Sequence, residues 1–360
     1  MAKKNSPLVL GTERIGKLLT QYAIPAIIAM TASSLYNMAD SIFIGHGVGP
    51  LAISGLALTF PLMNLVAAFG SLVGVGASTL VSVKLGQKDY EGANRVLGNV
   101  LVLNVLLGVA FTFVFLFLLD PILYFFGASE NTISYARDYM QIILYGNVVT
   151  HMYLGLNAVL RSSGFPKLAM YATLASVVIN CILNPIFIFG FGWGIKGSAW
   201  ATVISQVISL TGQMIHFSRP TQLLHFKKGI YKLKKEIVKG ILYIGMSPFL
   251  MNLCSCLIVI LINRGLKEYG GDMAIGAYGI VNRIIFLFVM IIMGFNQGMQ
   301  PIAGYNFGAR LYPRVTEVTK LTMKWAIGVA TTGFLLCQLF PTLIVNMFTT
   351  DDELVKAAVF

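Results

Sequence analysis

The chain has 360 residues, of which 56% are hydrophobic and only 11% are charged, and its mean hydropathy is +0.77. This composition excludes a soluble domain built on one core, because apolar segments of about 20 residues or more recur along the whole chain. The net charge of +12 indicates membrane topology and contact with anionic lipid, rather than nucleic-acid binding, because most basic residues lie between the apolar segments. We therefore predict an all-α polytopic membrane protein.

The apolar segments predict nine complete spans and the start of a tenth. Each is expected to be a helix, because a helix satisfies every backbone polar group within its own segment. The predicted spans cover residues 18–44, 51–83, 96–119, 139–160, 168–191, 195–217, 241–262, 274–307 and 325–348. The first follows a polar, basic stretch and is too long for the apolar region of a signal peptide, so we expect it to belong to the mature fold.

The first predicted span contains a single carboxylate, Asp40. Ser33, Asn37 and Asp40 follow one another at i, i+4 and i+7, so their side chains share one face of a helix. An ionised aspartate inside a bilayer costs a few kcal/mol, which makes Asp40 a candidate proton carrier. The alternative is that Asp40, close to the glycine-rich residues 45–49, lies in the polar headgroup layer. Pro25 cannot donate to its i−4 carbonyl, so we expect the helix to bend there.

Basic residues gather in every second connection and acidic residues in the others. By the positive-inside rule this pattern predicts a multi-pass protein of the cytoplasmic (inner) membrane with its N-terminus in the cytoplasm. The most basic connection, residues 219–239, carries Arg219, Lys227, Lys228, Lys232, Lys234, Lys235 and Lys239 against one acid, Glu236. We interpret it as a lipid-facing anchor between two halves; a regulatory or nucleic-acid site is the alternative.

A weak internal repeat divides the chain at this basic connection. A constant shift aligns Gly76 with Gly298 and Gly86 with Gly308. Six spans separate equivalent segments, so the two halves have the same orientation and a substrate path is expected between them. We predict two pseudo-symmetric six-helix lobes. The first comprises residues 1–218 with spans 1–6, the loop covers residues 219–240, and the second comprises residues 241–360 with spans 7–9 and the start of span 10. Since this second half is the shorter, we expect a truncated form of a twelve-span protein.

Several stretches carry a resemblance to a known family. Among them are YAIPAIIAMTASSLYNMADSIFIGHGVGPLAISGLALTFP, GVGASTLVSVKLGQKDYEGAN, NAVLRSSGFPKLAMYATLASVVINCILNPIFIF, GWGIKGSAWATVISQ and GMQPIAGYNFGAR. They resemble the MATE (multidrug and toxic compound extrusion) transporters, and are most similar to the DinF-like branch. The resemblance implies two six-helix lobes around a cavity that opens alternately to either side. It also implies cation-coupled export of organic, often cationic and lipophilic, compounds.

The resemblance also assigns an ion-coupling site. In the DinF-like branch the acid of the first helix couples the ion, and Asp40 occupies the matching position. The polar cluster of the family carries over to Asn180, Asn184 and Thr202, and Asn37 joins them through the face that it shares with Asp40. Pro25 matches a proline whose bending accompanies protonation in one proposed mechanism.

The coupling ion follows from a departure from the family pattern. Many relatives have an acid at the position of Asn184, so this chain offers Na⁺ one charged oxygen ligand fewer, whereas exchange of one proton at Asp40 stays feasible. We expect coupling to H⁺ rather than Na⁺, with no other cofactor, no metal and no catalytic residue.

Soft and polar side chains inside the spans form a predicted substrate cavity. They are Ser33, Tyr36, Met63, Asn64, Met152, Gln206, Gln297 and Gln300. Ordinary packing and hydrogen bonding between helices are the alternative explanation for these residues.

Two other functions compete with export. A lipid-linked oligosaccharide flippase has a related architecture but would be expected to have a strongly basic cavity, whereas the basic residues here lie mainly in loops. A passive or inactive membrane fragment is the second alternative. We do not expect an enzyme, because the four histidines are scattered along the chain. The expected partners are small organic substrates and the bilayer, without nucleic acid, and we expect a monomer.

Overall fold

The computed structural model describes residues 7–269 and 271–346, and every regular element in this part of the chain is a helix. In chain order the elements are η1 (Pro7–Gly11), α1 (Ile15–Gly47), α2 (Pro50–Gly86), α3 (Tyr90–Phe117), α4 (Leu119–Phe125), α5 (Ile133–Tyr145), α6 (Asn147–Ser162), α7 (Pro166–Pro185), the π-helical turn η2 (Ile186–Gly190), α8 (Gly194–Phe217), α9 (Lys235–Tyr269), α10 (Gly271–Gly308), α11 (Tyr312–Leu339) and α12 (Pro341–Asn346). This all-helical architecture confirms the predicted fold class.

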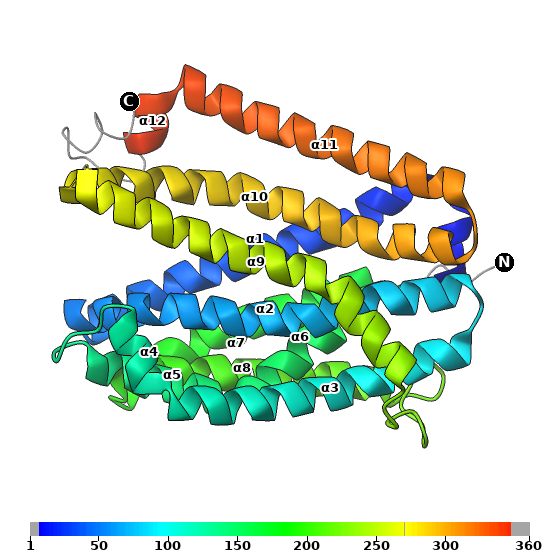
Figure 1. Ribbon diagram of the computed structural model, residues 1–360, viewed down its shortest axis with the longest axis horizontal. Helices are drawn as coiled ribbons and strands as arrows, with labels where there is room; N and C mark the ends of the chain where they lie inside the picture. The colour runs from blue at the N-terminus through cyan, green and yellow to red at the C-terminus, as the bar shows by residue number, and fades with distance from the viewer. Residues whose placement is uncertain (1–6, 270, 347–360) are drawn as a thin grey trace.

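The long helices lie side by side, with α1 and α2 in the middle of the bundle (Figure 1). On one side α1 packs against α10 and α2 against α9; on the other side α1 packs against α7, and α2 against α3 and α6. The core between them is apolar and includes Leu18, Val73, Val100, Leu156 and Ile302. Helices α1 and α2 therefore connect the helices on the two sides of the bundle.

The predicted spans coincide with helices of the described residues, although not all of these helices meet a criterion of length and hydropathy for crossing a membrane. Within the described residues, six helices are long and apolar enough to cross a membrane, or up to seven if the bent pair α5 and α6 counts as one span. The predicted span 139–160 is in fact this pair, which changes direction by 56° between Tyr145 and Asn147. The predicted span 325–348 breaks before Pro341, where α11 has ended and α12 begins, because proline cannot continue the backbone ladder.

Two predicted spans, those of α8 and α11, form helices that are long enough but too polar to meet the same criterion. The reason is clear in α8, which buries serine, threonine and glutamine side chains inside the bundle. The start of the predicted tenth span lies outside the described residues.

The internal repeat appears in the structure as a reciprocal contact between α2 and α10. Gly86 of α2 lies against the backbone of Tyr305, and Gly308 of α10 lies against the backbone of Val83. Gly308 follows Gly86 by the same number of residues as Tyr305 follows Val83. A pseudo-two-fold axis between α2 and α10 requires these two contacts to be equivalent. The same axis relates the packing of α1 on α10 to the packing of α9 on α2. The lobe boundaries around residues 219–240 stay a prediction.

The basic connection is held to α3 by two buried asparagines. Asn94 Oδ1 accepts from the His225 backbone N–H (2.9 Å), while Asn99 Nδ2 donates to the Ile230 carbonyl (3.2 Å) and Asn99 Oδ1 accepts from the Lys234 backbone N–H (3.0 Å). These bonds use the backbone of the loop, so its lysine side chains remain exposed on the surface.

Candidate functional site

Four helices converge on the carboxylate of Asp40, near the C-terminal end of α1. Asp40 accepts hydrogen bonds from Asn184 Nδ2 of α7 (2.8 Å), from Ser198 Oγ of α8 (2.5 Å) and from Tyr139 Oη of α5 (3.4 Å). Asp40 is only 4% exposed, so its carboxylate is buried between these helices. The carboxylate links α5, α7 and α8 to α1, and its depth relative to the lipid headgroups stays a prediction.

A second layer of polar groups lies directly behind this carboxylate. Asn184 Nδ2 also donates to Asn180 Oδ1 (2.7 Å), Asn180 Nδ2 donates to Thr202 Oγ1 (3.2 Å), and Thr202 Oγ1 is 2.8 Å from Tyr36 Oη. Helical spacing explains the arrangement, because Asn180 and Asn184 are four residues apart on α7, just as Tyr36 and Asp40 are on α1.

The electrostatics of the site follow from its donors, which are all neutral. In the described part of the chain no lysine or arginine pairs with Asp40. Three neutral donors stabilise the ionised carboxylate, whereas a protonated carboxyl group has a hydrogen of its own to donate. These donors occupy three of the four lone-pair positions of the carboxylate. Since a neutral carboxyl group is a weaker acceptor than a carboxylate, protonation is expected to weaken the bonds from Asn184, Ser198 and Tyr139. No group of three or more His, Cys, Asp or Glu that could hold a metal occurs among the described residues.

Among the predicted cavity residues, Tyr36 joins the Asp40 site through its contact with Thr202. Gln206 accepts from Thr150 Oγ1, and Gln297 Nε2 lies 3.2 Å from the Met30 sulfur. The remaining predicted cavity residues are half-buried or, for one, exposed: Ser33, Met63, Met152 and Gln300 are half-buried, and Asn64 is exposed. The side chain of Asn37 lies outside the described residues. Helix α1 continues through Pro25, and the predicted bend stays a prediction.

Sequence reasoning missed two hydrogen-bond donors to the Asp40 carboxylate, Tyr139 and Ser198. Ser198 had a signal that could have been read, because it precedes Thr202 by one helical turn and shares its face. Tyr139 had none, since nothing in its local sequence separates it from the other aromatic residues of the chain.

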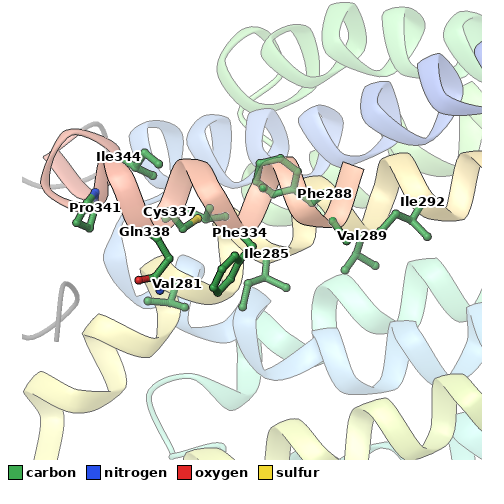
Figure 2. A pocket seen from close by; sticks show the side chains of 13 residues that line it. Val281, Ile285, Phe288, Val289, Ile292, Phe334, Cys337, Gln338, Pro341 and Ile344 are labelled. Carbon is green, nitrogen blue, oxygen red and sulfur yellow. The ribbon is translucent and has the colours of Figure 1, made fainter. Parts of the chain in front are cut away.

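A separate apolar cavity of about 440 Å³ lies between α10 and α11. Figure 2 shows Ile285, Phe288, Phe334, Cys337 and Gln338 among the side chains that line it. Its lining contains no residue of α1, α7 or α8, so this cavity is distinct from the site around Asp40.

A helical bundle with an internal repeat, which buries one carboxylate among neutral donors from several helices, has the organisation of a membrane transporter rather than of an enzyme. Comparison with known proteins agrees. The family model MatE matches residues 25–186 and 244–359. The chain belongs to the MATE family of ion-coupled, multi-pass membrane transporters.

The relatives define the similarity further. The chain is 31% identical over 348 residues to the multidrug export protein MepA of Staphylococcus aureus (strain MSSA476), and 32% identical over 352 residues to MepA of Staphylococcus haemolyticus (strain JCSC1435). Each alignment covers 96% of this chain and 76% of the relative. A solved structure described as the outward-facing conformation of a multidrug resistance MATE family transporter of the MOP superfamily superposes with a TM-score of 0.92 and 25% identity, over 99% of this chain and 80% of that one. The predicted MATE fold and the expectation that the chain is not an enzyme are confirmed.

Proposed function

We propose that this chain is a multidrug exporter of the DinF-like branch, which moves organic, often cationic and lipophilic, compounds out of the cell in exchange for protons. The similarity to two MepA proteins, each named as a multidrug export protein, supports the export half of this proposal. The buried carboxylate of Asp40, held by neutral donors from three other helices, is the observation that carries the coupling half.

The arrangement of donors favours H⁺ over Na⁺. Sodium is a hard cation that needs oxygen lone pairs directed at it, but both oxygens of Asp40 already accept hydrogen bonds. The neighbouring position, Asn184, brings no second carboxylate. A proton needs only one lone pair of Asp40, and Oδ2, which accepts a hydrogen bond from Tyr139, keeps its second lone pair for it.

Protonation can drive transport because Asp40 connects helices. With the carboxylate ionised, α5, α7 and α8 are hydrogen-bonded to α1; once it is protonated, these charge-assisted bonds weaken and the conformational equilibrium shifts. Each unit of pH gradient supplies about 1.4 kcal/mol per proton, enough for a roughly tenfold gradient of a monovalent cation, whose exchange for one proton moves no net charge; for an uncharged substrate a potential of about 100 mV adds about 2.3 kcal/mol. One proton per cycle therefore suffices for modest concentrative export.

The remaining assignments are part of the same proposal. Asn37, Asn180, Asn184 and Thr202 support the ion site, and Pro25 provides a hinge in α1. Substrate contacts come from the predicted cavity residues, between lobes that comprise residues 1–218 and 241–360. The protein is a monomer in the cytoplasmic membrane with its N-terminus inside, an orientation supported by the exposed lysines of the loop at 219–240.

Transport by the purified protein in sealed liposomes tests the proposal. We expect a pH gradient to drive movement of a fluorescent cationic dye, and a Na⁺ gradient at equal pH to drive none. Asp40→Asn should abolish the pH-driven movement. Asp120→Asn makes the same chemical change at a partly exposed carboxylate paired with Arg137, and should leave transport unchanged.

Each other result contradicts a stated part of the proposal. Transport by Asp40→Asn at the wild-type rate removes Asp40 as the proton carrier. Dye movement driven by Na⁺ alone replaces the coupling ion, and absence of dye movement in the wild-type protein contradicts the export function.

A further inference from the structure

The polar face of α8 does not end at the Asp40 site. Ser198, Thr202, Ser205, Ser209 and Gln213 are all buried, with at most 5% of any of them exposed. Their spacing of three or four residues places them on one face along most of α8. We call these five residues the polar ladder. From Ser198 to Gln213 the ladder extends about 22 Å at 1.5 Å per residue, which is most of the thickness of a bilayer core.

Helix α7 adds polar groups alongside the ladder. One turn after Thr202 along α8, Ser205 Oγ donates to the Thr202 carbonyl (2.8 Å). Ser176 Oγ of α7 donates to Ser205 Oγ (3.4 Å). Tyr153 of α6 interacts through its hydroxyl group with both Ser176 and Thr173. The chain of contacts that begins at Asp40 thus continues to a third helix, α6.

The contacts end at an arginine near the C-terminus of α6. Asn157 Nδ2 lies 3.3 Å from Thr173 Oγ1, and Arg161 donates to Asn157 Oδ1 at 2.8 Å. Within the described part of the chain no carboxylate forms an ion pair with Arg161. A half-buried guanidinium without a counter-ion needs other acceptors for its remaining N–H groups, and water is the available one.

The Gln213 end of the ladder lies at the level of these α6 residues. Thr150 of α6 donates to Gln206 of α8, which fixes how the two helices are aligned. Since α6 and α8 are separated by one antiparallel helix, they have the same direction. Asn157 follows Thr150 by seven residues, and Gln213 follows Gln206 by seven residues, which is almost two full turns in each helix. Gln213 is therefore placed at the level of Asn157, next to the Arg161 end.

Several polar atoms of the ladder have no partner in the protein. Within the described residues, Ser209 Oγ and both polar atoms of the Gln213 amide make no hydrogen bond, although these residues are only 4% and 1% exposed. Asn184 Oδ1, beside Asp40, is in the same condition. Buried polar groups in proteins are almost always hydrogen-bonded, to ordered water where the protein offers nothing. Unpaired atoms at the Gln213 end of the ladder, and at Asn184 beside its Ser198 end, thus indicate water near both ends.

We propose that the polar ladder is a hydrated path through which the proton of Asp40 exchanges with solvent at the Arg161 end of the bundle. A proton leaves the Asp40 carboxyl oxygen for a water molecule, passes along water and the hydroxyl groups of Thr202, Ser205 and Ser209, and reaches solvent beside Arg161. This path rests on the proposed proton coupling, but the hydration that it requires is independent of transport.

Silver-ion accessibility tests the hydration directly. The background protein carries alanine in place of Cys181, Cys254, Cys256 and Cys337. Single cysteines are then introduced as Ser209→Cys and Leu210→Cys, which are neighbours on α8 and are both buried (4% and 7% exposed). After timed exposure to Ag⁺, the protein is unfolded in detergent and its unblocked thiols are counted with a fluorescent maleimide. Because the reactive species is the hydrated thiolate, we expect Ser209→Cys to be blocked about tenfold faster or more. Equal rates, or no blocking of Ser209→Cys, overturn the proposal.

Transport tests the path. Gln213→Leu keeps the approximate volume of the side chain and removes both unpaired polar atoms. We expect Gln213→Leu to slow pH-driven dye movement about tenfold, roughly 1.4 kcal/mol, while the dye dissociation constant stays at the wild-type value. Gln213→Asn, which keeps the amide group, should retain most of the wild-type rate. Thr322→Val removes another buried, unpaired polar atom, on α11 and away from the ladder, and should transport as the wild type does.

The two inferences fail in different ways. If the wild type moves dye and Gln213→Leu behaves like Thr322→Val, the path is refuted and the exporter stands. If the wild type moves no dye, the exporter is refuted and the silver experiment alone decides whether the ladder is hydrated. Should Gln213→Leu fail to fold, the milder Ser209→Ala variant decides the transport test in its place.

Discussion

The contact between α2 and α10 makes a quantitative prediction about two glycines. A Cβ added to Gly86 would overlap the carbonyl oxygen of Tyr305, and one added to Gly308 would overlap that of Val83. The obstacle in both cases is backbone in a helix, which cannot rotate aside as a side chain can. Alanine at either position therefore has to push the two helices apart.

The cost of this separation can be bounded. Overpacking a well-packed contact typically costs about 1–3 kcal/mol, and replacing a helical glycine by alanine returns up to about 1 kcal/mol of helix propensity. We expect Gly86→Ala and Gly308→Ala each to lower the free energy of unfolding by about 1–2 kcal/mol. Since the same separation accommodates both methyl groups, the double variant should lose less than the sum of the single losses, by about 0.5 kcal/mol or more.

Unfolding by sodium dodecyl sulfate in mixed micelles, followed by tryptophan fluorescence, measures these free energies. Gly212→Ala on α8 and Gly328→Ala on α11 are matched controls, because a Cβ at either position meets no atom within 4 Å. These two variants should be neutral or slightly more stable than the wild type. The reasoning fails if Gly86→Ala is as stable as Gly212→Ala, or if the losses of the two contact variants simply add.

Two further predictions concern the N-terminal part of α3. Asn99→Leu removes the hydrogen bonds that hold the basic loop at Ile230 and Lys234, each worth about 1 kcal/mol net, so trypsin should cleave this loop faster; an unchanged cleavage rate would show that the loop is held elsewhere. Asp89 hydrogen-bonds Lys84 and also caps the N-terminus of α3, and these contacts hold the pKa of its carboxyl below the usual range. Because the folded-state pKa is the lower one, this stabilisation is complete above about pH 4 and is lost as the pH falls through the folded-state value. Asp89→Ala should cost about 0.5–2 kcal/mol at neutral pH. Asp89→Asn, which can still cap the helix, should cost less than Asp89→Ala and should remove the acid-dependent part of the stabilisation. Unfolding midpoints measured across pH test this. Equal losses in the two variants would exclude the cap as the stabilising contact.

The positions of most helices could be predicted because hydropathy is a local property. The predicted span 51–83 corresponds to α2 (Pro50–Gly86), and the span 274–307 to α10 (Gly271–Gly308). Spans that the structure alters are those where a local break intervenes, as at Gly146 between α5 and α6, where a short turn changes the direction of the chain without changing its mean hydropathy.

Asp40 was identifiable from the sequence for a related reason. An acid within a long apolar run is costly wherever the helices around it lie, so it attracts attention before any packing is known. The i, i+4 spacing of Asn180 and Asn184 could likewise be read directly, because neighbours on one helix face depend only on helical geometry.

By itself the sequence determined that the chain is a helical membrane protein with a repeat, and that Asp40 is the single carboxylate of its first long apolar segment. Only the tertiary structure decided what Asp40 touches, because Tyr139 and Ser198 reach it from helices distant in sequence. It also decided where the polar residues of α8 point. Hydropathy averages over all faces of a helix, whereas the energetic consequence of a serine or glutamine depends on whether its face meets lipid, solvent or a neighbouring helix, and the packing of α6, α7 and α8 settles that for this chain.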